Sequence, residues 1–311
     1  MINYIIRQLL LGIPTIIGVT LVTFLLFNIF GGDPALQFLG KNATAEEIEA
    51  MRELYGFNKP LLAQYFDYLR QVLTFDFGRS FSTKEPVTTM IAGGVIPSLS
   101  LTLPALLSTS LLAISVSLLA AFYRGQPIDR ILVIGAVFGM SISFLVYIVV
   151  GQYLLAFRFP LFQIHGYHAG LLERWQYLIL PILIMVVVGL GYDTRYYRSV
   201  MVEETGKDYI VTAFAKGLSK PRVMFLHMLK NAMVPIVTRM MISVPFLVTG
   251  SLLLESFFGI PGLGSMLLEA LGSSDLPVIK AYTVLISVLF ILSNIATDVL
   301  YAVVDPRVRL S

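Results

Sequence analysis

Cysteine is absent from this chain of 311 residues, and histidine occurs only three times. Without cysteine there is no disulfide framework, no thiolate metal site and no cysteine nucleophile. Charged residues are also scarce, at 13%, which is about half of their usual share in a soluble protein. Hydrophobic residues make up 57% of the chain, and the mean hydropathy is +0.81. This composition predicts a membrane protein and excludes a cytosolic enzyme, a nucleic-acid-binding module and a disordered chain.

Six stretches are long and apolar enough to cross a bilayer, whose core of about 30 Å needs about 20 residues per helix. The first could be mistaken for a signal peptide, but its apolar run is too long and no small-residue cleavage site follows it. The expected fold is therefore all-α, a polytopic membrane protein with six transmembrane helices. We expect the spans at Leu9–Phe30, Leu99–Tyr123, Ile131–Phe157, Trp175–Tyr192, Val234–Leu254 and Ala281–Val304.

The distribution of basic residues predicts the orientation. Six spans put both termini on one side of the membrane. Of the 22 Lys and Arg residues, 13 fall on the side of the termini, three in the short loops opposite and six in the long first loop. Short cytoplasmic segments carry an excess of Lys and Arg, whereas long loops count weakly. We therefore expect both the N-terminus and the C-terminus in the cytoplasm.

The segment between the first two expected spans, residues 31–96, is too long to be a mere connection. Thr44 and Glu47 have the spacing of a capping box, which predicts a helix start, and Gly56 predicts its end. A second amphipathic helix is expected after Pro60. We therefore expect a small folded cap over the outer mouth. The apolar face of its second helix would consist of Leu61, Leu62, Tyr65, Phe66, Leu69, Val72 and Leu73.

A second long loop, at about residues 193–233, is basic, mixed in charge and helical in period. The segment Tyr209–Lys216 predicts a short helix that ends at Gly217, and Lys220-Pro221 predicts the start of the next helix. A helix, a glycine turn and a second helix on the cytoplasmic side are typical of a docking element. Amphipathic helices that lie on the lipid surface are an equally good interpretation of the pattern alone.

In this loop the chain resembles a known family, the binding-protein-dependent ABC importer permeases, and more narrowly the dipeptide/oligopeptide/nickel permeases of the first-permease type. The family's EAA loop is matched by Asp208-Tyr209 and Thr212-Ala213-Phe214-Ala215-Lys216-Gly217-Leu218. Val211-Thr212-Ala213 stands where the general pattern has Glu-Ala-Ala, and His227-Met228-Leu229-Lys230 stands where it has Ile-x-Leu-Pro. The resemblance covers nearly the whole chain. Its other pieces are Gly32-Asp33-Pro34; Pro60, Gln64-Tyr65 and Tyr68; Asp76-Phe77-Gly78 with Ser80; Thr194-Arg195 and Arg198; Glu255, Phe258 and Pro261-Gly262-Leu263-Gly264; and Asp305-Pro306-Arg307.

The resemblance implies the type I ABC importer permease fold, with an extracytoplasmic cap and a cytoplasmic coupling (EAA) loop, in a bacterial inner membrane. The chain would form half of a pathway with a second homologous permease subunit. Two ATP-binding subunits would bind the inner loops, and an extracytoplasmic substrate-binding protein would deliver cargo to the cap. This chain would bind no cofactor itself, because ATP and Mg²⁺ would sit on the partner subunits. Its surroundings would be membrane lipid, with no nucleic acid.

The same resemblance implies that the coupling loop transmits movement from the ATPases to the spans. Gly217 permits the tight turn without a Cβ penalty, and the small side chains of Ala213 and Ala215 permit the close approach of a partner. Lys216 could pair with an acidic rim on the ATPase or simply remain solvated. The residues implied in ATPase coupling are Tyr209, Thr212, Ala213, Ala215, Lys216, Gly217 and Leu218.

Other motifs and polar groups of the sequence could carry chemistry of their own. No G-x-x-x-x-G-K-[ST] phosphate loop is present, so the chain is expected not to be an enzyme. His165 and His168 have a spacing that could hold a metal, but without a third ligand no metal site is expected. Asn294 and Asp298 lie four residues apart in the sixth expected span. They either line the pathway or join helices by hydrogen bonds.

We therefore expect a permease subunit of an ATP-driven importer for di- or oligopeptides. An importer of nickel or another small solute is the first alternative, because in this family the binding protein selects the cargo. An ion-coupled secondary transporter is an alternative of a different class, but such proteins often show an internal repeat and none is found. Along the chain we expect the N-terminus and first span at 1–30, the cap at 31–96 and a five-span core at 97–311.

Overall fold

The computed structural model describes residues 2–30, 33–39, 43–170 and 172–304. Within these ranges the chain is helical and has no strand, only an isolated bridge between Arg79 and Pro86. The all-α prediction is confirmed. The elements are α1 (Ile2–Phe30), α2 (Pro34–Leu39), α3 (Ala45–Tyr55), α4 (Leu61–Thr74), α5 (Val87–Phe122), α6 (Pro127–Ser141), α7 (Phe144–Gly151), the π-helix η1 (Gln152–Arg158), α8 (Arg174–Glu204), α9 (Asp208–Ala215), α10 (Lys220–Val223), the π-helix η2 (Met224–Met228), α11 (Leu229–Ile242), α12 (Val244–Thr249), α13 (Leu252–Phe258), α14 (Leu263–Gly272) and α15 (Leu276–Val304).

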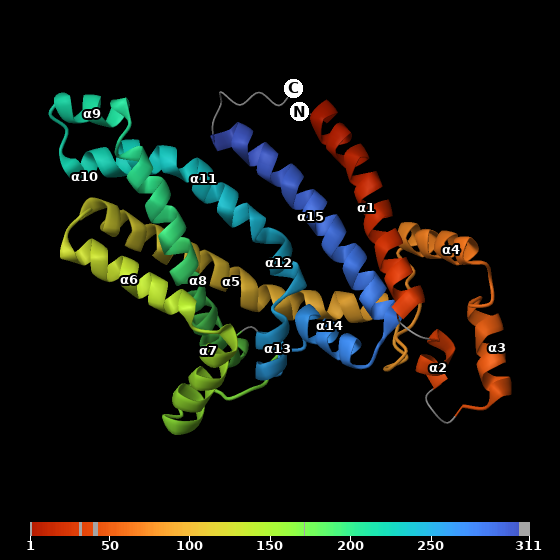
Figure 1. The fold of residues 1–311 in the computed structure, drawn as a ribbon. Helices are drawn as coiled ribbons and strands as arrows, with labels where there is room; N and C mark the ends of the chain where they lie inside the picture. Colours follow the sequence, from red (N-terminus) through yellow and green to blue (C-terminus); the bar gives the residue numbers. More distant parts are fainter. Residues whose placement is uncertain (1, 31–32, 40–42, 171, 305–311) are drawn as a thin grey trace.

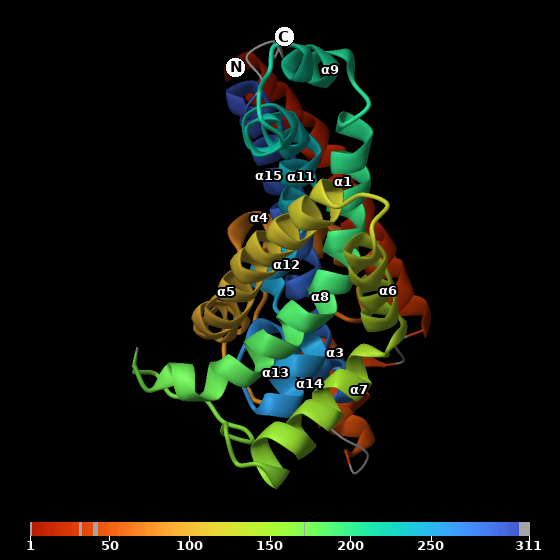
Figure 2. The same ribbon diagram turned by 90° about the vertical axis from the view of Figure 1, so that its left-hand side faces the viewer.

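Five helices among the described residues are long and apolar enough to cross a membrane, and two helix pairs are each bent by 90°. The bent pairs are α6 with α7–η1, and α13 with α14. In Figures 1 and 2, α9 lies at the same end of the bundle as the start of α1, whereas α13 and α14 lie toward the opposite end. The run α10–α12 leads away from the α9 end and α15 returns to it. By length and composition the described residues contain five candidate spans, or up to seven if each bent pair counts as one, a range that includes the six expected. We call the bent pair α13–α14 the re-entrant hairpin.

The third expected span is not one continuous helix, so the prediction of a single helix over Ile131–Phe157 is wrong. Ile142 and Ser143 have extended backbone angles between α6 and α7. The break leaves carbonyls of the last turn of α6 without their helical partners, and unsatisfied groups are costly at membrane depth. The Tyr147 hydroxyl donates to the carbonyl of Gly139 at 2.8 Å and so replaces one of these lost bonds.

The fifth expected span is shifted along the chain. The helical run begins at Lys220 and ends at Thr249, instead of extending over Val234–Leu254. It ends because Gly250 has φ +73°, a region that residues with a Cβ rarely occupy. Side chains satisfy the freed carbonyls. The Tyr282 hydroxyl donates to the Thr249 carbonyl at 2.6 Å, and the Thr102 hydroxyl lies 2.6 Å from the Leu247 carbonyl.

The first two cap signals in the sequence are confirmed. Thr44 and Glu47 form the capping box at the start of α3, and Gly56 ends that helix with φ +70°. Asp33 pairs with Arg52 at 2.6 Å and so joins the chain before α2 to α3, whereas Gly32 of the same motif lies outside the described residues. The helix after the cap, α5, begins at Val87, twelve residues before the expected second span.

The amphipathic helix predicted after Pro60 is confirmed as α4, and only part of its apolar face is buried within this chain. Tyr65 and Val72 are buried, together with Tyr68, which was not on the predicted face. Leu62, Phe66 and Leu73 are 74%, 66% and 81% exposed, and Leu61 is exposed as well, so this part of the face lies on the surface of the chain. Periodicity finds an apolar stripe but not its partner. In a chain whose outside is lipid or another subunit, apolar residues do not mark the core.

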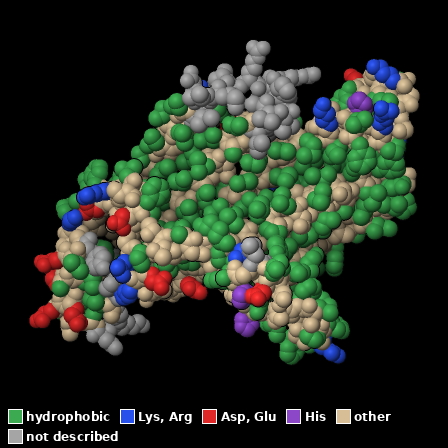
Figure 3. All heavy atoms as spheres, turned by 180° about the vertical axis from the view of Figure 1, so that it is seen from behind, with side chains coloured by type: hydrophobic (Ala, Val, Ile, Leu, Met, Phe, Trp, Pro, Cys, Tyr) green, Lys and Arg blue, Asp and Glu red, His purple; other side chains and the backbone are tan. Residues whose placement is uncertain are grey.

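Three buried clusters hold the bundle together. The first joins α1 and α4 to α14 and α15, around Tyr65 and Tyr282. The second lies near α9 and joins α5, α8, α9 and α11, around Tyr197 and Met201. The third joins α5, α7 and α8 to α13, around Phe258. Figure 3 shows a broad hydrophobic band between a basic end over α9 and α10 and a charged end over the cap. This distribution suits a membrane crossing with two wet ends.

Candidate functional site

Helix α9 is a short element held between two long helices at one end of the bundle (Figures 1 and 2). Its inner face is buried, with Ile210 at 3% and Ala213 at 5% exposure in the cluster that also contains residues of α8 and η2. Its outer face presents Val211 and Phe214, which are 62% and 45% exposed. Helix α9 is therefore anchored on one side and presents exposed apolar side chains on the other, which is the usual form of a protein-binding surface.

The joint after α9 is tight. Gly217 has φ +78°. Its N–H donates to the carbonyl of Phe214 at 2.9 Å, and the N–H of Leu218 donates to that of Ala213 at 3.3 Å. After the turn, the ammonium of Lys220 donates to the Phe122 carbonyl at 2.6 Å and lies 4.4 Å from the centre of its ring. The tight turn thus connects α9 to the start of α10, which Lys220 in turn fastens to the end of α5.

The other predicted coupling residues divide between the two faces. Thr212, Ala215 and Lys216 are exposed, whereas Ala213 packs inward and does not offer its methyl to a partner. The Tyr209 hydroxyl donates to a carboxylate oxygen of Glu204, the last residue of α8. Burial and this neighbouring carboxylate raise the pKa of Tyr209 to about 12, so the hydroxyl keeps its proton.

Sequence reasoning did not assign Val211 and Phe214 a role in the site. Both residues lie in the predicted short helix, but the pattern of so short a helix does not show which of its faces is buried. The spacing from Ile210 and Ala213, which the cluster of α8 and η2 buries, is the signal that separates the two faces.

A bidentate ion pair fixes the same end of the bundle. Nε and Nη2 of Arg198 on α8 lie 2.6 Å and 2.8 Å from the two carboxylate oxygens of Asp129, in the first turn of α6. The second of these oxygens also accepts from the N–H of Gly125 at 2.9 Å. Arg198 belongs to the motif noted before the coupling loop, but its partner Asp129 was not foreseen. The pair holds α6 at a fixed angle to α8.

At the opposite end, the re-entrant hairpin α13–α14 is organised around one carboxylate. Glu255 is fully buried and accepts from the Ser98 hydroxyl of α5 at 2.8 Å and from the N–H groups of Gly264 at 2.7 Å, Ser265 at 3.1 Å and Ser251 at 3.1 Å. A Cβ on Gly264 would lie 2.8 Å from backbone atoms of Leu252 and Ser251. The glycines of this motif thus let the two arms close on Glu255.

The cap is fastened to the core by a second carboxylate. Asp275, directly before α15, accepts from the hydroxyls of Ser80 and Ser82 at 2.5 Å and 2.8 Å and from the N–H groups of Phe81 and Ser82 at 3.0 Å and 3.1 Å. Burial alone would raise the pKa of Asp275, but these hydrogen bonds outweigh it and hold the pKa below its usual value. Ser80 belongs to the noted cap motif, and Asp275 is its unforeseen partner.

A groove of about 470 Å³ runs between α5, α8 and α12. Both breaks in the spans border it. Phe144 follows the break between α6 and α7, and Gly250 and Ser251 form the break between α12 and α13. Non-helical backbone at membrane depth is tolerated only inside protein or along a water-filled cavity. The groove also contains the carboxylate of Asp193, which makes it the best candidate for a pathway surface.

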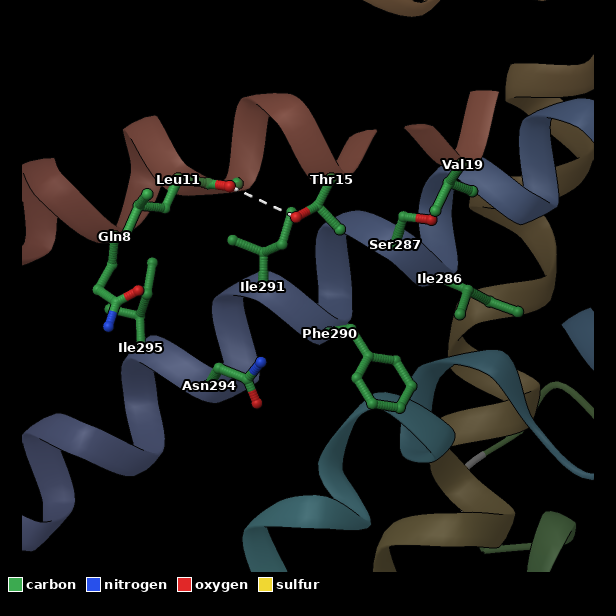
Figure 4. Close-up of a pocket in the computed structure, with 11 residues that line it drawn as sticks. Gln8, Leu11, Thr15, Val19, Ile286, Ser287, Phe290, Ile291, Asn294 and Ile295 are labelled. Carbon is green, nitrogen blue, oxygen red and sulfur yellow. Dashed lines mark hydrogen bonds between the residues drawn. The ribbon is translucent and has the colours of Figure 1, made fainter. Parts of the chain in front are cut away.

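The predicted polar pair of α15 lies elsewhere. Asp298 accepts from the Tyr4 hydroxyl at 2.6 Å, and Gln8 donates to the same hydroxyl at 2.7 Å, so this residue joins α15 to α1. Asn294 lines a second groove, of about 440 Å³, between these two helices. Figure 4 shows it among Gln8 and Thr15 of α1 and Ser287 of α15. Of the two roles considered, the geometry of Asp298 matches the joining of helices.

The histidines between the third and fourth spans do not converge on a common point. His168 Nδ1 lies 2.6 Å from a carboxylate oxygen of Glu173, whereas the ring of His165 lies beside Gly259 after α13. In the described part of the chain, no group of three His, Cys, Asp or Glu residues could hold a metal ion.

Comparisons with known proteins agree with this architecture. Residues 113–310 match the family described as binding-protein-dependent transport system inner membrane component, and residues 1–102 match the N-terminal family of the same membrane components. The glutathione transport system permease protein GsiC of Salmonella choleraesuis is 36% identical over 314 aligned positions, with 99% of both chains covered. GsiC of Escherichia coli K12 is 35% identical with the same coverage.

Proposed function

The chain belongs to the family of binding-protein-dependent transport system inner membrane components, and we propose that it is the permease subunit that forms half of the pathway in an ATP-driven importer of di- or oligopeptides. Membership makes the chain a membrane subunit of an ABC importer, in the inner membrane, with ATP-binding and substrate-binding partners. The coupling site, the pathway surface, the orientation and the cargo are our proposals.

The observation that carries the proposal is the geometry of α9. Its inner residues Ile210 and Ala213 pack on α8 and η2, while Val211 and Phe214 point outward. We assign this outer face to a groove on an ATP-binding subunit. When the ATPases close on ATP, force on α9 would pass through Gly217 into α10–α12 and through Glu204 into α8. Both helices border the groove that contains Asp193.

The orientation follows from the same element. Because ATP is a cytoplasmic ligand, the α9 end faces the cytoplasm, and the excess of Lys and Arg there supports this. The start of α1 and the end of α15 lie at that end (Figure 1). The cap, fastened through Asp275, then lies outside the cell, where a substrate-binding protein would release cargo.

The assembly contains a second, homologous permease. The groove between α5, α8 and α12 is open along one side, so this chain encloses only part of a pathway. The second permease would cover the open side of the groove. No phosphate loop is found in the sequence, so the two ATP-binding subunits carry ATP and Mg²⁺.

The cargo class is supported by the relatives. GsiC is named for glutathione transport, and glutathione is a tripeptide with a free amino group and free carboxylates. An identity of 36% supports a peptide-sized, charged cargo without fixing which peptide is carried.

The test is uptake by the purified transport complex, reconstituted in liposomes with its substrate-binding protein outside. We expect uptake of labelled dialanine or glutathione that requires ATP inside. Labelled nickel serves as the comparison for the other cargo of the family. Uptake of nickel but of no peptide would contradict the proposed cargo, and uptake driven by an ion gradient without ATP would contradict the mechanism.

A further inference from the structure

Two opposite charges meet beside the groove of α5, α8 and α12. Asp193 of α8 lines the groove, and Nε of Arg239 on α11 lies 3.3 Å from its Oδ1. The side chain of Asp193 is 16% exposed and that of Arg239 is 42% exposed. Ionisable groups at membrane depth are rare, and they mark the path of a substrate or ion unless another role is evident.

The comparison with Asp129 and Arg198 separates two kinds of ion pair. That pair is bidentate, with two contacts below 3 Å, and its side chains are 6% and 24% exposed. Bidentate geometry fixes two helices in place. The pair of Asp193 and Arg239 has one long contact and greater exposure, so it is a weak tie between helices. A partly exposed pair with a single long contact contributes little to stability by itself.

The surroundings of Asp193 suit a small charged molecule. The groove has room for a drug-sized ligand at about 470 Å³. Its walls are largely apolar, with Leu106, Met185 and Phe246, and a few hydroxyls such as those of Thr109 and Ser243 face it. The start of the re-entrant hairpin borders it on the side away from α9. A mainly apolar cleft with a few placed polar groups is the usual form of a ligand site.

We propose that Asp193 and Arg239 form a subsite for the two charged ends of a zwitterionic cargo. The carboxylate of Asp193 binds the ammonium group of the cargo, and the guanidinium of Arg239 binds its carboxylate, in place of their contact with each other. The exchange keeps every charge paired, so that no uncompensated charge is left in the groove. This inference rests on the proposed function and adds to it the residues that recognise free peptide ends.

The experiment uses the absence of cysteine in this chain. Ser243→Cys places a single thiol in the groove, and Asn294→Cys places a matched control in the groove between α1 and α15. The complete transport complex is placed in nanodiscs without its binding protein. The labelling rate of each thiol by N-ethylmaleimide is then followed on this chain by mass spectrometry. Dialanine, N-acetyl-dialanine and dialanine amide are compared as protecting ligands.

We expect dialanine to slow the labelling of Ser243→Cys and to leave Asn294→Cys unchanged. Blocking either charged end should raise the concentration for half-protection about tenfold, because a charge-assisted hydrogen bond is lost. Asp193→Asn should raise the concentration of dialanine for half-protection about tenfold. The same substitution should leave the concentration of N-acetyl-dialanine for half-protection unchanged, because that ligand lacks the ammonium group. A purely structural role of Asp193 would not produce this dependence on the ligand.

Equal protection by free and blocked peptides, or no protection by dialanine, would overturn the subsite while the wild-type complex still imports dialanine with ATP. A wild-type complex that imports no peptide at all would instead overturn the proposed function, and the cargo class assumed here with it. The uptake measurement on the same preparation separates these two failures.

Discussion

The hydroxyl of Ser98 on α5 contacts both arms of the re-entrant hairpin. It donates to Oε1 of Glu255 on α13 at 2.8 Å and accepts from the N–H of Leu263 at the start of α14, also at 2.8 Å. A single side chain in the second span thus fixes the element that borders the groove on the side away from α9. The movement of α5 and that of the hairpin are therefore linked.

This link predicts that the hairpin tolerates no added volume at Gly264. In Gly264→Ala the new methyl would meet backbone atoms at 2.8 Å and a carboxylate oxygen of Glu255 at 2.9 Å. We expect a loss of about 1–3 kcal/mol and a lower melting temperature of the purified protein. Gly272→Ala, at the end of α14 with open space around it, is the control and should be neutral. Equal melting temperatures for both variants would contradict the closed hairpin.

Glu255→Gln tests the carboxylate itself. The amide is nearly isosteric, but one of the two carboxylate oxygens becomes an NH₂ group and turns a donor toward the N–H groups of the hairpin. We expect a loss of about 2 kcal/mol or more, because a buried donor then faces donors. Glu269→Gln, at an exposed position of α14, is the matched control. Thermal unfolding in detergent measures both, and a neutral Glu255→Gln would show that the hairpin does not depend on this charge.

Asp275 predicts a pH dependence of stability. Its folded pKa is held below the unfolded value of about 3.9, so its contribution is fully present above that value and is lost as the pH falls through it toward the folded pKa. We expect the melting temperature to fall below about pH 4, and Asp275→Asn to be less stable at neutral pH with a weaker fall on acidification. If the melting temperature of Asp275→Asn fell with pH as that of the wild type does, other carboxylates would be responsible for the loss of stability in acid.

Gly217→Asp tests the joint after α9. The left-handed backbone at φ +78° disfavours a side chain, although there is open space around the glycine. The strain should disturb the turn without damaging the core. We expect ATP-driven uptake to be lost while the chain remains in the membrane at normal abundance. Gly206→Asp, in the turn before α9 where no positive φ occurs, should retain most uptake. Retained uptake in Gly217→Asp would mean that α9 does not transmit movement through this joint.

Local signals in the sequence predicted several features well. Thr44, Glu47, Gly56 and Gly217 act through backbone geometry within a few residues, so their pattern is sufficient to place helix ends. Long apolar runs placed most spans for the same reason. The break at Ile142 and Ser143 was not predicted, because neither residue forbids a helix and the tertiary hydrogen bond that stabilises the break, from Tyr147 to Gly139 across it, has no sequence signature.

The sequence did not predict which distant residues pair with one another in hydrogen bonds and ion pairs. Ser80, Arg198 and Glu255 were recognised as motif residues, but what each binds depends on which helices pack together. Their partners Asp275, Asp129 and Ser98 lie up to 195 positions away. The role of the predicted coupling residues and of Asn294 stays a prediction, because it concerns subunits beyond this chain.

The most direct test of the account is site-specific photo-crosslinking from the outer face of α9. A benzophenone amino acid at Phe214, 45% exposed, is compared with one at Val187, 48% exposed on α8 within the membrane. In native membranes, Phe214 should crosslink to a subunit that carries a G-x-x-x-x-G-K-[ST] phosphate loop, with a yield that changes on addition of ATP, and Val187 should not. Crosslinks from Phe214 to lipid alone would contradict the assignment of α9 as the coupling helix.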